Sequence, residues 1–166
     1  MKRLASVIAA LSLVAASVSM AAAQAKPSFA GKWTLVPDPN AAAAAGGRGG
    51  GRGGFGGLGQ GGTIEQNDKT LTVTTTTQAG ETKAVYNLDG TESKNPLSMG
   101  GNSIDRVSKV KWDGAKLVIT TTTNFNGNAN ESTQTWSLDA TGNLVIESTS
   151  NFGGNATTTK QTYKKG

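Results

Sequence analysis

Apolar or hydroxyl-bearing residues alternate with charged and polar ones along most of the chain after residue 62. Side chains on a β-strand point to opposite faces in turn, so this period of two predicts strands with one buried and one solvent-facing side. Threonine and other β-branched residues dominate these segments, and turn-forming residues recur at short intervals between them. The pattern predicts an all-β chain, an antiparallel up-and-down meander of about eight to ten strands.

The turns between these segments are of two kinds. Asp89-Gly90 and Asp113-Gly114 are typical of tight hairpins, whereas residues 78–80 and 126–130 form looser links rich in Gly and Asn. Successive turns of an up-and-down sheet alternate between its two ends. We therefore expect the tight turns to share one end of the molecule and the looser links to share the other.

The inward-facing residues are sorted along the strands. Near the tight turns they are large and apolar, and we expect the following residues to plug that end: Trp33, Trp112, Leu117, Leu138 and Leu144. Near the looser links they are mostly Thr, Ser and Gln, together with Arg106. Closing the sheet on itself hides its two edges, so we expect a lipocalin-like barrel with one polar-lined open end. A two-sheet β-sandwich is the alternative.

The chain divides into four segments. Residues 1–25 form a predicted signal peptide, residues 26–36 hold the first barrel strand, and residues 63–166 form the remainder of the barrel. Between these strand regions lies an Ala- and Gly-rich insert at residues 37–62, in which twelve of the seventeen residues 46–62 are glycine. Ordering such a segment costs more conformational entropy than its side chains recover, so we expect the insert to be disordered.

The N-terminal segment predicts export. Lys2 and Arg3 precede an apolar run at residues 4–18, and small residues follow it at 21–25. A basic start, a short apolar middle and an A-x-A end are typical of a secretory signal peptide, and the run is too short for a membrane span. We expect cleavage after Ala23 or Ala25 and a periplasmic or extracellular protein.

Composition excludes several kinds of chemistry. The chain has no Cys and no His, so it lacks the residues of a thiol nucleophile, a Ser-His-Asp triad or an ordinary zinc site, and we expect no cofactor and no metal. The formal charge of +5 includes Lys2, Arg3, Arg48 and Arg52, which precede the meander. The rest is nearly neutral, so we expect no nucleic-acid partner. Lysines on the outward face likewise argue against a membrane-spanning barrel.

The segment FAGKWTLV, residues 29–36, resembles the G-x-W opening of the calycin superfamily, which contains the lipocalins and fatty-acid-binding proteins. Residues 64–73, 108–118 and 159–163 resemble successive strands of fatty-acid-binding proteins, and the chain is also similar to exported bacterial proteins with lipocalin-like domains. The resemblance implies a closed barrel in which Trp33 packs across the closed end. It also implies a ligand bound inside the barrel.

The chain departs from that family at the positions that hold a fatty-acid carboxylate. The Arg-x-Tyr pair of the last strand becomes Gln161 and Tyr163, and a second Arg position falls at or beside Trp136. The helical lid is replaced by the Gly-rich insert. The candidate ligand-binding residues are the polar or aromatic residues on the inward face: Arg106, Gln134, Trp136, Gln161 and Tyr163.

Two interpretations of function follow from these residues. The first is a non-catalytic, exported barrel that binds a small amphipathic or polar molecule in its polar-lined end. The second is a non-catalytic structural or interaction protein without a small-molecule ligand, whose Gly-rich segment is a flexible arm. Purely structural roles are the alternative to the first interpretation. Arg106 is compatible with an outward, solvated position, and the tryptophans are compatible with core packing. An enzyme is not expected, since the carboxylates fall on the outward face or at turns.

Overall fold

The computed structural model describes residues 25–38, 57–77, 80–99, 102–125, 127–152 and 155–166. These residues contain eleven β-strands and no helix, which confirms the all-β prediction. The strands are β1 (Gly31–Leu35), β2 (Gly61–Gln66), β3 (Thr70–Thr77), β4 (Gly80–Asn87), β5 (Ser93–Lys94), β6 (Leu97–Met99), β7 (Asn102–Asp113), β8 (Lys116–Phe125), β9 (Asn128–Leu138), β10 (Leu144–Phe152) and β11 (Asn155–Lys165).

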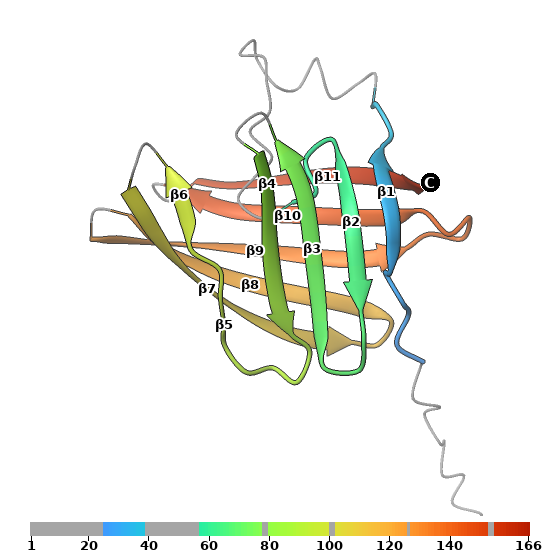
Figure 1. Ribbon diagram of the computed structural model, residues 1–166, viewed down its shortest axis with the longest axis horizontal. Helices are drawn as coiled ribbons and strands as arrows, with labels where there is room; N and C mark the ends of the chain where they lie inside the picture. Colours follow the sequence, from blue (N-terminus) through green and yellow to red (C-terminus); the bar gives the residue numbers. More distant parts are fainter. Residues whose placement is uncertain (1–24, 39–56, 78–79, 100–101, 126, 153–154) are drawn as a thin grey trace, which may run out of the picture.

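All strand pairs are antiparallel, and the order across the sheet is β4-β3-β2-β1-β11-β10-β9-β8-β7-β5, with β6 paired to β7. The first strand joins the last, because Trp33 pairs with Lys165 and Leu35 with Tyr163. In Figure 1, β1–β4 lie across β8–β11, and the sheet curls until β4 approaches β7. The result is a nearly closed barrel made from one continuous sheet, as predicted, and not a two-sheet sandwich.

Side chains close the seam between β4 and β7. The short strand β5 pairs with β7 through Ser93 opposite Ser108. On its other side, Asn95 Oδ1 accepts a hydrogen bond from the Val85 N–H at 2.8 Å, and Asn95 Nδ2 donates to the Val85 carbonyl at 2.9 Å. Ser93 Oγ similarly accepts from the Asn87 N–H at 2.7 Å. The Asn95 amide thus reproduces at Val85 the two bonds that a neighbouring strand would make, which satisfies the edge of β4 at this residue.

Tight turns hold one end of the barrel. The β7–β8 turn places Gly114 at φ +58°, a left-handed conformation that glycine adopts without a steric penalty. In the β9–β10 turn, the Asp139 carboxylate accepts hydrogen bonds from the backbone N–H groups of Thr141 and Asn143. A hydrogen bond from the Thr141 hydroxyl, together with these backbone bonds, lowers the pKa of Asp139 to about 2. We call this the closed end.

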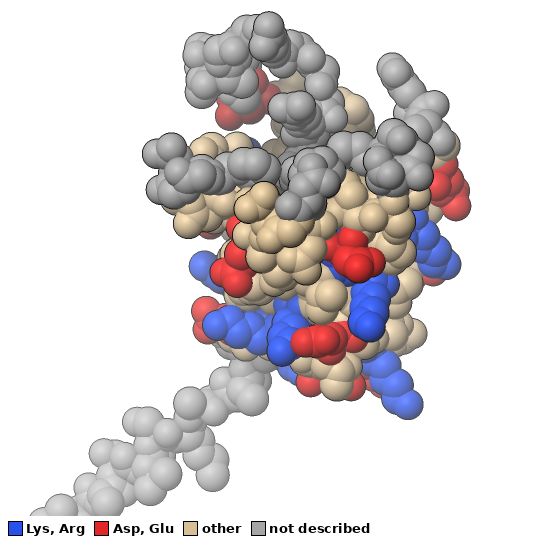
Figure 2. Space-filling model, turned by 90° about the vertical axis from the view of Figure 1, so that its left-hand side faces the viewer, with Lys and Arg blue, Asp and Glu red and all other residues tan. Residues whose placement is uncertain are grey.

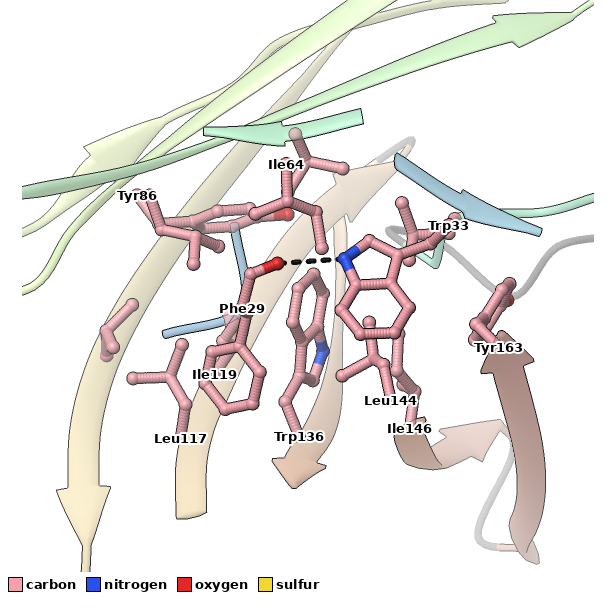
Figure 3. Packing of buried hydrophobic residues seen from close by; sticks show 14 of the residues in the cluster. Phe29, Trp33, Ile64, Tyr86, Leu117, Ile119, Trp136, Leu144, Ile146 and Tyr163 are labelled. Carbon is pink, nitrogen blue, oxygen red and sulfur yellow. Dashed lines mark hydrogen bonds between the residues drawn. The ribbon is translucent and has the colours of Figure 1, made fainter. Parts of the chain in front are cut away.

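The apolar core fills the closed end (Figure 3). Phe29 lies before β1 and enters the barrel, where its ring stacks on Trp112 and meets Trp136 edge-on, each at a centroid distance of 6.1 Å. The Trp33 indole N–H donates to the Phe29 carbonyl at 2.8 Å, so the tryptophan is buried without losing its hydrogen bond. Each fully buried large side chain contributes roughly 1.5–3 kcal/mol to folding before entropy is counted.

The end of the predicted insert differs from expectation. Residues 57–62 were assigned to a disordered segment, but Leu58 is fully buried in the core, and Gly61 and Gly62 belong to β2. A Cβ on Gly61 would collide with the Trp33 carbonyl, and one on Gly62 would collide with the Thr74 carbonyl. These glycines therefore allow a close approach of strands, which composition alone does not distinguish from a linker. Residues 39–56 lie outside the described residues.

Candidate functional site

Cross-strand partners on the inner face form rows that run around the barrel. One row toward the closed end consists of Trp112, Leu117, Trp136, Ile146 and Gln161. The next row consists of Val110, Ile119, Gln134, Ser148 and Thr159. The third row, two residues further along each strand, consists of Ser108, Thr121, Ser132, Ser150 and Thr157. The inner face therefore changes from apolar to polar within two rows.

Solvent exposure changes along the same direction on β10 and β11. Leu144 and Ile146 are fully buried, Ser148 is half-buried, and Ser150 is exposed, although all four lie on the inward face. Residues of β11 follow the same order, from buried Tyr163 to exposed Thr159. Water therefore reaches the inner face at the end opposite the tight turns. We call this the polar end.

Five polar inward residues of β7–β9 remain buried in the polar half of the inner face, and we call them the polar site: Arg106, Ser108, Thr121, Thr123 and Gln134. Three adjacent strands position them, because Arg106 pairs with Thr123 and Ser108 with Thr121 across β7 and β8. The Ser108 and Thr121 hydroxyls hydrogen-bond to each other at 2.8 Å. Gln134 Oε1 accepts from the Trp136 indole N–H at 3.0 Å, which leaves its amide N–H groups without a partner among the described residues.

Arg106 is a buried cation without a counter-ion. The residue is only 8% exposed, and its Nε has no hydrogen-bond partner among the described residues. All eleven Asp and Glu residues of the chain fall within the described residues, and every one of them is exposed. Burying an unpaired charge costs several kcal/mol in a low-dielectric interior, so this arrangement is unusual for a residue with only a structural role.

The positive charge of Arg106 on β7 acts electrostatically on Tyr86 of β4, on the other side of the seam. Burial raises the pKa of the Tyr86 hydroxyl, and the positive charge of Arg106 offsets part of that increase. The backbone connects the same two strands, because the Asn95 N–H donates to the Arg106 carbonyl at 2.9 Å while the Asn95 amide holds Val85. The inner surface near the seam therefore carries a positive potential that no acidic side chain neutralises.

The candidate ligand-binding residues occupy two separate environments. Arg106 and Gln134 lie in the polar site, and the interpretation that placed Arg106 outward is wrong. Trp136 and Tyr163 are fully buried in the apolar core. The Tyr163 hydroxyl donates to Gln161 Oε1 and lies within the same distance, 3.2 Å, of the Gly59 carbonyl. Burial raises the pKa of Tyr163 to about 12.

The expected plug residues lie at the closed end. Trp33, Leu117 and Leu144 are buried, whereas Trp112 and Leu138 are partly buried against the same cluster. Ser108, Thr121 and Thr123 are not among the predicted site residues, although the period of two places them on the inward face. The roles of Phe29 and Asn95 had no sequence signal, because both depend on contacts with distant strands.

The outer surface shows mixed charge. On the face seen in Figure 2, basic and acidic side chains lie beside one another and do not gather into a patch of one sign. Within the described part of the chain, no group of three or more Asp, Glu, His or Cys residues is arranged to hold a metal ion. Nor does any helix there have the length and apolar character needed to cross a membrane.

Comparisons with known proteins do not assign the chain to a family. No protein-family description matches it, and no curated protein is significantly similar to it in sequence. The function of the chain is therefore inferred from the geometry of the barrel and its polar site.

Proposed function

We propose that this protein is an exported, non-catalytic barrel that binds a small polar or amphipathic molecule in the polar half of its interior. A nearly closed barrel with a packed closed end and a solvent-accessible polar end is compatible with a lipocalin-like binding protein. The observation that carries the proposal is Arg106 on the inner face toward the polar end, which is buried, has no carboxylate partner and has an Nε without a hydrogen bond among the described residues. A bound molecule that supplies hydrogen-bond acceptors would offset the cost of burying this group.

The absence of catalytic function is part of the proposal. Acid–base catalysis needs a titratable group that faces the bound substrate, and the carboxylates of this chain all face solvent. Export is proposed from the basic and apolar N-terminal segment. Sequencing the N-terminus of protein recovered from outside the inner membrane tests the export proposal. A start at Gln24 or Lys26 is expected, and a start at Met1 would contradict it.

Tryptophan fluorescence tests ligand binding, because Trp136 is hydrogen-bonded to Gln134 of the polar site. We expect a saturable change in emission when the purified protein is titrated with a panel of sugars, sugar acids, hydroxylated aromatics and lipids. Ser148 faces inward on β10 and Thr149 faces outward beside it. Ser148→Phe places a bulky side chain on the inner face beside Gln134 and should abolish the response, whereas the matched variant Thr149→Phe should retain it. If no member of the panel changes the emission, the binding proposal is wrong.

A further inference from the structure

We propose that the ligand is a small hydroxylated carboxylate whose anionic group pairs with Arg106. This inference rests on the proposed binding function and specifies its ligand class. Three observations support this inference. The polar site holds a buried cation without a counter-ion, short hydroxyl side chains surround that cation, and the apolar closed end of the barrel is already filled.

The charge requires an anion from outside the chain. No Asp or Glu among the described residues forms an ion pair with Arg106, and all eleven of them are exposed. A guanidinium offers paired N–H donors whose spacing matches the two oxygens of a carboxylate. The buried Nε, which lacks an acceptor, is one of these donors. A carboxylate is therefore the group that would satisfy both the charge and the geometry of Arg106.

The neighbours of Arg106 favour a ligand that carries hydroxyl groups. Thr123 is the direct cross-strand partner of Arg106, and Ser108 and Thr121 lie one row away. Hydroxyl side chains both donate and accept, and so do the hydroxyls of a sugar acid. The amide N–H groups of Gln134, which have no partner among the described residues, add donors at the boundary with the apolar core. An alkyl chain at this position would leave Arg106 Nε and the Gln134 amide N–H groups without partners.

The apolar end leaves no place for a long hydrocarbon tail. Leu117, Ile119, Trp136, Leu144 and Ile146 are all 0–1% exposed and pack against one another in the closed end (Figure 3). A fatty acid would have to displace these side chains at a cost of several kcal/mol. Exposed inward residues on β10 and β11 instead give a water-soluble molecule direct access to the polar site. The ligand is therefore expected to be compact and hydrophilic.

Isothermal titration calorimetry with four probes tests this assignment. Gluconate is the hydroxylated carboxylate, sorbitol is its neutral counterpart, octanoate is a carboxylate without hydroxyls, and inorganic phosphate is a compact anion of another class. We expect gluconate to bind the purified protein about ten- to a hundredfold more tightly than sorbitol, as for hydrogen bonds to a charged group. Tighter binding of octanoate or phosphate than of gluconate, or no gluconate binding at millimolar concentration, would overturn the inference.

Two variants at the same net charge identify the responsible residue. Arg106→Met should weaken gluconate binding by about ten- to a hundredfold, whereas Lys111→Met, on the outward face of the same strand, should leave it unchanged. Thr123→Asp should also block gluconate, because it supplies an internal carboxylate beside Arg106, and Thr123→Asn is its neutral control. Equal binding by the Arg106 and Lys111 variants would refute the role of Arg106.

The outcomes separate this inference from the proposed function. If sorbitol or a hydroxylated aromatic binds the wild type and Arg106→Met equally, and Ser148→Phe abolishes that binding, the barrel binds a ligand but the anion assignment is wrong. If no compound of either panel binds, both proposals are wrong. Circular dichroism of each variant establishes that lost binding does not result from unfolding.

Discussion

The two halves of this barrel are built on one sheet but differ in the side chains that they bury. At the closed end, Leu117 and Leu144 are fully buried, and even the Trp33 indole N–H has a hydrogen-bond partner. Two rows beyond Leu117 on the inner face, Ser150 is open to solvent, and one row further Arg106 is buried without a counter-ion. In the first half, the buried side chains are apolar or hydrogen-bonded. In the second half, a charged side chain is buried without a counter-ion.

This difference teaches where the stability and the binding capacity of the barrel lie. Burial of apolar area stabilises a fold, whereas burial of an unpaired charge opposes folding. Such a cost is typically retained where function requires it, because substitutions that remove it tend to stabilise a protein while impairing its activity. The contrast can be tested by substitutions that act on one half at a time.

The largest expected effect is at the closed end. Leu117→Ala should lower the free energy of unfolding by about 2–5 kcal/mol, because it removes a fully buried side chain and leaves a cavity. Thr121→Ser, on the same face of β8 but in the polar site, removes only one methyl group and should cost about 1 kcal/mol or less. Denaturant unfolding of both variants measures the difference. Equal losses would contradict the division into two halves.

The next effect is at the seam that joins the halves. Asn95→Ala removes both hydrogen bonds to the Val85 backbone and should cost about 2 kcal/mol, since two backbone groups lose their partners. Lys94→Ala, an exposed neighbour, is the control and should change stability by less than about 0.5 kcal/mol. Hydrogen exchange at the Val85 amide should accelerate only in the Asn95 variant. Unchanged exchange would show that the side chain does not close the barrel.

Much of this fold could be predicted because the side chains of a strand alternate between its two faces with a period of two residues. Parity placed Leu117, Arg106 and Tyr163 on one face, and the tight turns placed the large residues together. Parity also put Ser108 and Thr123 on the inward face, but it could not show that Arg106 lacks a partner, since that depends on the positions of all the carboxylates. Nor could parity show that the Asn95 side chain bonds to the edge of β4, because the local pattern of residues does not indicate which distant strand this side chain contacts.

The third prediction concerns the polar half. In the absence of ligand, Arg106→Met should raise the free energy of unfolding by about 1 kcal/mol, because a flexible apolar side chain replaces a buried charge without a counter-ion. The same substitution at exposed Lys111 should change stability by less than about 0.5 kcal/mol. Thermal and denaturant unfolding provide the measurement. A clear loss of stability in Arg106→Met would mean that the guanidinium stabilises the free barrel, which would remove the contrast between the halves.

The smallest expected effect compares two charges. Arg106 has no partner, whereas the Asp139 carboxylate at the closed end accepts hydrogen bonds from Thr141 and Asn143, which lower its pKa from 3.8 to about 2. A lowered pKa means that ionised Asp139 stabilises the folded state above pH 4, and that this contribution disappears as the pH falls toward 2. Asn at this position keeps an acceptor oxygen but does not titrate. The difference in unfolding free energy between wild type and Asp139→Asn should therefore shrink between pH 5 and pH 2. A difference that stays constant over that range would show that the carboxylate charge adds nothing to the closed end, and that only hydrogen-bond geometry distinguishes this turn from the polar site.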